Sequence, residues 1–227
     1  MTFIKTRFSS FEEYLTEEEA LLPEGRCEYW DGELIPVPVE SLRHDSIANY
    51  LLILLFQTGI NFSLVSPGSV EIETIGRTRT RFPDLTVLDD VHLTLLARRA
   101  TVTCDMPPPR IVAEVVSPGD EDSDEDIRNY KDKRDQYAAI GIPEYWLVDP
   151  DREWVKVGTL VSGVYQFMTF QGEDAIASPT FPELKLTAAQ ALGAGQSSTE
   201  AIDAFRLTEN VFRQLNRDLK DRSSSPP

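Results

Sequence analysis

The sequence predicts an α/β fold built on a mixed β-sheet. Short apolar runs rich in β-branched residues, which are typical of buried strands, recur at residues 81–88, 111–116 and 144–149. A helical pattern at residues 124–141 separates the last two runs, as expected of a helix that returns over a sheet. The turn dipeptides Asp31-Gly32 and Ser162-Gly163 predict tight antiparallel hairpins, which complete a sheet of mixed direction.

The first elements along the chain are a short helix, a hairpin and a buried helix. Ser10 and Glu13 fit a capping box, which predicts a helix that the Pro-Glu-Gly sequence at 23–25 stops. The segment 27–37 reads as two strands on either side of Asp31-Gly32. Residues 46–57 are apolar on most sides and therefore predict a largely buried helix.

The middle of the chain predicts further strands and helices in alternation. Before the run at 111–116, strands are expected at residues 61–66, 69–75 and 81–88, and a helix at residues 90–99. The helix at 124–141 ends at Gly141, with Pro143 just beyond as a stop signal. A strand at 144–149 follows, and then a hairpin formed by residues 154–160 and 164–170.

These elements predict a single domain over residues 1–192, because no repeat and no linker interrupts them before residue 190. A C-terminal helical extension is expected at residues 193–222, with an apolar stripe from about Glu200 to Leu219. The Ser-Pro sequence at 223–227 predicts a disordered tail.

The strongest global feature is the formal net charge of −16. It argues against a protein that coats nucleic acid, because phosphate binding draws most of its affinity from Lys and Arg. A narrow basic groove remains compatible with it, since the charge is patterned. An acidic run at 119–126 is followed by Arg128, Lys131, Lys133 and Arg134.

The cysteine content and the hydropathy pattern indicate the cellular compartment of the protein. Cys27 and Cys104 make neither a disulfide framework nor a metal cluster, which predicts a reduced, cytoplasmic protein. No apolar run approaches the roughly 20 residues that span a bilayer, and the N-terminus lacks the apolar core of a signal peptide. We therefore expect no membrane partner.

Two acidic residues lie within strands that are otherwise apolar. Glu114 interrupts the β-branched run at 111–116, where an unpaired buried carboxylate would cost several kcal/mol or give up its charge. Asp84 lies 114 − 84 = 30 residues earlier and shares a strand face with Thr86 and Leu88. If the two strands are neighbours, the carboxylates can converge.

Two interpretations of this pair are open. Converging carboxylates repel unless they share a proton or bind a cation, and Mg²⁺ prefers carboxylate and water oxygens. Alternatively, each acid is paired with an Arg or with a backbone N–H in a structural role. A cation on the helix at 124–141 could reach the pair, since Lys133 lies at a matching depth. On a helical wheel Arg134 falls near the centre of the packed face, and Lys131 and Lys133 flank it.

At these residues the sequence resembles the Uma-type putative restriction endonucleases, members of the PD-(D/E)XK nuclease superfamily. The resemblance covers roughly residues 10–192, and its specific part consists of the segments PD at 83–84, AEVVSPG at 113–119 and RNYKDKRDQYAAIGIPEYWLVDP at 128–150. EYWDGEL at 28–34, Ser41 with His44, and 178–192 also match. It implies a restriction-endonuclease-like mixed sheet flanked by helices.

Carried over by position, the resemblance assigns metal binding to Asp84 and Glu114, helped by the backbone carbonyl of Val115. The superfamily's Lys two residues after the second acid is absent, because Val116 stands there. The family is thought to supply a Lys from the next helix in a K-x-x-x-Y pattern, which Lys133 and Tyr137 fit. Lys133 would orient or activate the attacking water, or offset transition-state charge.

Several accessory residues follow from the same comparison. Arg81 or Arg134 would contact phosphate, and Glu28 and His44 would lie at the edge of the site. As plain residues, Glu28 reads rather as a surface acid of the hairpin and His44 as a residue near the start of a helix, and the sequence alone favours these readings.

The resemblance implies a DNA endonuclease that uses Mg²⁺, with Mn²⁺ as a substitute, and a homodimer. Two alternative hypotheses assume the same fold without catalytic activity. One is a catalytically degenerate module that binds nucleic acid or protein, which the missing strand Lys and the net charge favour. The other is a structural role in a dimer or complex, with the stripe at 200–219 as the contact surface.

Overall fold

The structure is a computed structural model that describes residues 4–38, 41–116 and 124–193, with the backbone alone for 124–129. Its largest sheet has six strands in the order β11-β10-β9-β8-β6-β3. The strands are β3 (Val65–Pro67), β6 (Leu85–Val87), β8 (Ile111–Val115), β9 (Glu144–Asp149), β10 (Trp154–Val161) and β11 (Val164–Gln171). β8 and β9 run parallel and the other neighbours antiparallel, so the predicted mixed α/β sheet is confirmed.

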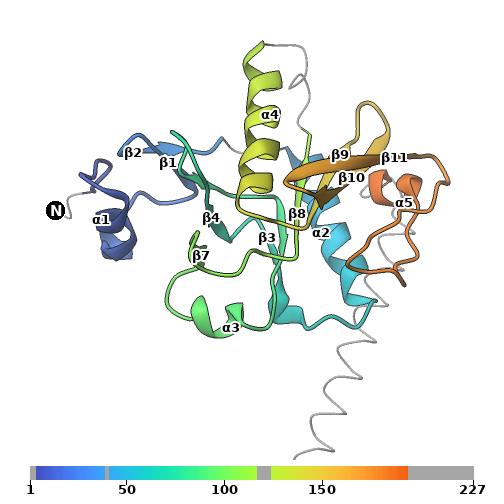
Figure 1. Ribbon diagram of the computed structural model, residues 1–227, viewed down its shortest axis with the longest axis horizontal. Coiled ribbons are helices and arrows are strands. Elements are labelled where there is room, and N and C mark those ends of the chain that lie inside the picture. Colours follow the sequence, from blue (N-terminus) through green and yellow to red (C-terminus); the bar gives the residue numbers. More distant parts are fainter. Residues whose placement is uncertain (1–3, 39–40, 117–123, 194–227) are drawn as a thin grey trace, which may run out of the picture.

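The helix α4 (Asp124–Ala139) joins the two parallel strands and covers one face of the sheet. In Figure 1 it rises at the centre, between the N-terminal hairpin and the strands β9 to β11. Alternate residues of β8 face opposite sides, as a strand requires. Val112 packs in the cluster that contains Tyr137 of α4, whereas Ala113 packs in the cluster that contains α2 and α5.

The opposite face is covered by α2 (Leu42–Phe56) and α5 (Ala188–Leu192). Ile47 and Leu51 of α2 pack with Leu85 and Val87 of β6 in the larger apolar cluster. Burial of these apolar surfaces fixes the strand β6 between a helix on one side and β8 beside it. The chain segment that carries Asp84 is therefore held from two directions.

The N-terminal half forms a separate set of short elements beside the sheet. They are α1 (Phe11–Thr16), the 3₁₀ turns η1 (Glu19–Leu21) and η2 (Phe62–Leu64), α3 (His92–Leu95), and the strands β1 (Cys27–Trp30), β2 (Glu33–Pro36), β4 (Glu71–Glu73), β5 (Thr80–Arg81) and β7 (Thr101–Val102). β1 and β2 form the predicted hairpin, with positive φ at Asp31 and Gly32. β5, β4 and β7 form a three-stranded sheet.

Several predicted boundaries are wrong. The buried helix begins at Leu42 rather than Ser46, because Ser41 caps it by accepting the N–H of His44. The strand predicted at 81–88 is broken into β5 and β6, since Pro83 has no N–H to donate to a ladder. The capping box is half formed: Ser10 accepts from Glu13, whose carboxylate reaches Ser9 instead of Ser10.

Two further elements differ from prediction. The helix expected at 90–99 shortens to α3, and the strand expected at 61–66 begins with η2 and becomes extended only at Val65. The extension at 193–222, the stripe at 200–219 and the tail at 223–227 lie outside the described residues, apart from Gly193. Neither cysteine forms a disulfide bond: Cys27 is buried and Cys104 is exposed. None of the helices in the described part is long and apolar enough to span a bilayer.

Candidate active site

Asp84 and Glu114 lie opposite each other on neighbouring antiparallel strands. In the register of β6 and β8, Leu85 pairs with Ala113, so the next position in each direction aligns Asp84 with Glu114. Directly opposed residues project from the same face of a sheet. The two strands that carry the acids are therefore neighbours, which is the condition for the carboxylates to converge. Both acids are buried, with 8% of Asp84 and 3% of Glu114 exposed.

Asp84 follows Pro83 at the point where the strand breaks, and its side chain replaces a ladder bond. Its Oδ2 accepts the backbone N–H of Val115 at an N···O distance of 2.7 Å. Nε2 of His44, in the first turn of α2, lies 3.1 Å from the same oxygen. That nitrogen also lies 2.8 Å from the carbonyl oxygen of Val115. His44 therefore contacts two of the three groups to which the resemblance assigns metal binding.

Glu114 is held by two side chains of α4. The ammonium group of Lys133 donates to Oε2 at 2.8 Å, and the hydroxyl of Tyr137 donates to Oε1 at 2.7 Å. Lys133 and Tyr137 are four residues apart and so lie on the same face of the helix. These two contacts explain why an acid is tolerated in an apolar strand. Both carboxylate oxygens of Glu114 accept a hydrogen bond, and one of the two donors is a cation.

Burial dominates the electrostatics of this cluster. It raises the pKa of Glu114, because desolvation outweighs the attraction of Lys133, and the nearby charge of Asp84 adds to the rise. Burial alone would lower the pKa of Lys133, but the charges of Glu114 and Asp84 outweigh it, and the net pKa is raised. Lys133 is thus held as a cation.

Arg134 does not lie where the helical wheel placed it. Its side chain is 42% exposed and pairs with the adjacent Asp135 at 2.8 Å. The face of α4 that packs on the sheet is centred on Tyr137, which is fully buried, and Lys133 lies on that face. A wheel based on apolar residues could not place this face, because a buried acid draws a lysine into it.

Arg81 is buried and engaged by neighbours instead of pointing into open space. Its Nη1 lies 3.0 and 3.2 Å from the two carboxylate oxygens of Glu28, and its Nε donates to Gln136 at 3.0 Å. Gln136 also donates to the carbonyl oxygens of Ile75 and Thr78. The sequence reasoning missed Gln136, although its position three residues after Lys133 places it beside that lysine on the helix.

The donor atoms at the acid pair fit a hard divalent cation. Asp84, Glu114 and the Val115 carbonyl offer only oxygen, which Mg²⁺ and Mn²⁺ prefer. Among the described residues, no group of three or more acid, His or Cys side chains could hold a metal. An ion held by two carboxylates would keep several waters, as Mg²⁺ usually does.

Two buried hydroxyls near the pair suit such a hydrated ion. In the described structure, Oγ1 of Thr86 and the hydroxyl of Tyr145 are buried without a hydrogen-bond partner. Thr86 pairs with Val112, and Val112 with Tyr145, so the three occupy one row across the sheet, on the face of the acids. Buried hydroxyls without protein partners commonly bond to water.

Comparisons with known proteins agree with this architecture. The family model Uma2, described as "Putative restriction endonuclease", matches residues 11–189. A solved structure from Anabaena variabilis ATCC 29413, described as a putative nuclease belonging to DUF820, superposes with a TM-score of 0.59 at 20% sequence identity. The match covers 80% of this chain and 96% of that chain, so the two share a fold. A search of curated proteins gives no match.

Proposed function

The chain belongs to the Uma2 family of putative restriction endonucleases, and on this basis we propose that it is a metal-dependent endonuclease that hydrolyses DNA phosphodiester bonds. The observation that carries the proposal is the buried cluster of Asp84, Glu114 and Lys133. Two opposed carboxylates with a fixed cation are more than a strand needs for stability, since apolar residues of similar size would pack there without desolvated charge.

In this proposal Asp84, Glu114 and the carbonyl oxygen of Val115 hold Mg²⁺ or Mn²⁺. The ion would polarise the scissile phosphate and lower the pKa of the attacking water. Lys133 contributes positive charge beside the reacting phosphate, where a preorganised cation stabilises developing negative charge. The raised pKa of Lys133 supports this electrostatic role over general-base catalysis, because a base must first lose its proton.

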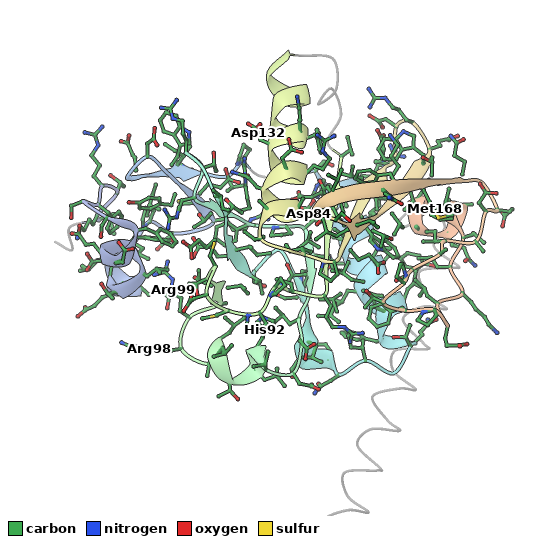
Figure 2. The ribbon with its side chains drawn as sticks, in the orientation of Figure 1. Asp84, His92, Arg98, Arg99, Asp132 and Met168 are labelled. Carbon is green, nitrogen blue, oxygen red and sulfur yellow. The ribbon has the colours of Figure 1, made fainter. Side chains whose placement is uncertain are left out.

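The test combines metal binding with cleavage. Calorimetric titration of Mg²⁺ and Mn²⁺ into the wild type and into Asp84→Asn and Glu114→Gln is paired with nicking of supercoiled plasmid. Binding and nicking in the wild type, both lost in the two variants, are expected. Asp132→Asn is the matched control, because Asp132 is an exposed acid on α4, labelled in Figure 2, and should leave both properties unchanged. Wild-type protein that neither binds metal nor nicks DNA contradicts the proposal.

A second candidate is a catalytically degenerate module that binds nucleic acid or protein on the same fold. The observation that favours it is the engagement of both acids by protein groups, Glu114 by Lys133 and Tyr137, and Asp84 by His44 and Val115. Metal binding without cleavage of any DNA would support this candidate over the enzyme.

The enzyme proposal includes assembly as a homodimer in a cytoplasmic, reduced setting. Two copies of one active site can cut both strands of a duplex, whereas one copy cuts a single strand per encounter. Sedimentation at micromolar concentration tests this point: a single species of monomer mass would contradict it. Nicking without double-strand cleavage would then be the expected product.

A further inference from the structure

A polar pocket opens directly beside Asp84. It has a volume of about 270 Å³ and lies between the first turns of α2 and the turn that contains Pro67 and Gly68. Besides Asp84, its lining includes Arg26, Asp45 and Asn49. The pocket therefore joins one acid of the candidate active site to a cation that is not part of the cluster around Glu114.

Arg26 differs from most arginines of the described chain. Arg81 and Arg99 each contact a buried or half-buried glutamate, and Arg43 and Arg77 contact aspartates. No carboxylate among the described residues lies within ion-pair distance of Arg26, although its side chain is half buried. A half-buried guanidinium without a counter-ion is an incomplete interaction, because five N–H groups remain to be satisfied by water or by an anion.

The guanidinium of Arg26 lies close to the backbone of Gly68. Gly68 has a φ of +60°, and a Cβ atom at this residue would lie 3.2 Å from Nη1 of Arg26. The backbone conformation of this turn favours glycine, because L side chains rarely adopt a positive φ. Arg26 thus lines the pocket beside this turn, where its planar fork can bind two oxygens of one phosphate.

The other residues that line the pocket favour a ligand in which an anion and a cation bind together. Asn49, which lines the pocket, carries an amide that can donate to an anion. Asp45 and Asp84 oppose an anion that binds alone. A phosphodiester strand with a divalent ion at Asp84 meets both conditions, because the ion offsets the acids and Arg26 pairs with a phosphate.

We propose that this pocket is a phosphate subsite, in which Arg26 binds a backbone phosphate of the DNA strand next to the phosphate at Asp84 and Glu114. The inference rests on the proposed nuclease function and adds to it the path of the strand. The substrate would run from the acid pair past the start of α2 toward Gly68. Arg26 here is a binding residue, and neither Arg81 nor Arg134 is required for this contact.

The test is DNA binding measured apart from cleavage. Fluorescence anisotropy of a labelled duplex is recorded across a range of NaCl concentrations, without divalent ions and with Ca²⁺, which carboxylates also hold. Arg26→Ala should weaken binding about tenfold at low salt and reduce the slope of log K against log salt by about one, as loss of one phosphate contact predicts. Arg26→Lys should lie between Arg26→Ala and the wild type, since it keeps charge without the bidentate fork.

Arg98→Ala is the matched control. Arg98 is exposed and has no ion pair among the described residues, and Figure 2 places it at the edge of the molecule, far from Asp84. Binding by Arg98→Ala should equal that of the wild type. An equal loss in Arg98→Ala and Arg26→Ala would show a general charge effect and overturn the inference. If Arg26→Ala has a lower melting temperature than the wild type, DNA binding by Arg26→Lys is compared with that by Arg26→Gln, and stronger binding by Arg26→Lys supports the phosphate contact.

The outcomes separate the inference from the function on which it rests. Wild type that binds and nicks DNA, with Arg26→Ala indistinguishable from it, overturns the phosphate subsite and leaves the nuclease intact. Wild type that binds no DNA under either condition overturns both. Loss of binding in Arg26→Ala, with metal binding in calorimetry unchanged, supports the subsite.

Discussion

Nε2 of His44 lies 3.1 Å from Oδ2 of Asp84 and 2.8 Å from the carbonyl oxygen of Val115. One imidazole thus contacts two of the three oxygen donors that the proposed ion would use. A ring N–H and a cation compete for the same lone pairs, so the side chain that orders these oxygens also opposes the ion.

Replacement of His44 by alanine should therefore tighten Mn²⁺ binding. The expected gain is on the order of tenfold, since a hydrogen bond to a charged group contributes roughly 1.5 kcal/mol and each 1.4 kcal/mol is a factor of ten. Isothermal titration measures it. His44→Gln, which can keep an N–H donor, is the control and should resemble the wild type. Weaker binding by His44→Ala would instead make His44 a metal ligand.

Replacement of Lys133 by methionine should lower the rate of DNA cleavage by about 10²–10³-fold, the usual effect of removing one preorganised transition-state contact. Single-turnover cleavage with saturating Mg²⁺ is the measurement. Lys131→Met is the control, because Lys131 is exposed and lies two residues away on the same helix. Equal losses in the two variants would assign the effect to general positive charge on α4.

The ionisation of Glu114 should make stability depend on pH. Burial raises its folded pKa above 4.5, so its contribution to stability is fully present below pH 4.5 and is lost as pH rises through the folded pKa. Lys133 adds no slope here, since its raised pKa keeps it charged below pH 10.5. In metal-free urea titrations the wild type should lose stability relative to Glu114→Gln as pH rises above 4.5. A parallel pH dependence in both proteins would contradict the assignment.

Divalent metal should reverse this trend. An ion needs ionised carboxylates, so the increase in melting temperature caused by Mg²⁺ should be larger at pH 8 than at pH 5. Differential scanning fluorimetry of the wild type, with Glu114→Gln as the control without a ligand carboxylate, measures the difference. An equal Mg²⁺ effect at both pH values would place the ion elsewhere.

Replacement of Tyr137 by phenylalanine should destabilise the fold by roughly 1.5–3 kcal/mol, because its hydroxyl donates to a buried carboxylate at 2.7 Å. Tyr165→Phe is the matched control: its hydroxyl donates to the neutral carbonyl of Ile142 at 2.8 Å, which contributes about 0.5–1.5 kcal/mol. Urea denaturation at pH 7 compares them. A larger loss in Tyr165→Phe would mean that the Tyr137 contact is weak.

The sequence predicts those elements that depend on residues close together along the chain. The strands β8 and β9, the hairpin of β10 and β11 and the helix α4 follow from apolar runs and turn residues. The start of α2 did not, because Leu42, the apolar residue of its first turn, is exposed, and the buried apolar pattern begins only at Ile47. The division of the segment 81–88 into β5 and β6 was also not predicted, since it depends on the bond between Asp84 and Val115, 31 residues away.

The candidate site was predictable in its acids and less so in its cations. Asp84 and Glu114 stood out as charges in apolar strands, and Lys133 was chosen through the family resemblance. Arg26 gives no local signal in the sequence, because the role proposed for it depends on the pocket between α2 and the turn at Gly68. Contacts made between distant segments cannot be found from spacing along one element.

The cation at Glu114 comes from the helix α4, whereas the position two residues after Glu114, just beyond the end of β8, is the buried apolar residue Val116. A lysine on a central strand is as immobile as the sheet itself. A lysine on α4 is in place only while the helix stays docked, and a helix can open locally at a lower free energy than the whole domain. Under the proposed function, cleavage would therefore depend on the docking of α4: local opening of this helix would remove Lys133 from Glu114 while the sheet stays folded.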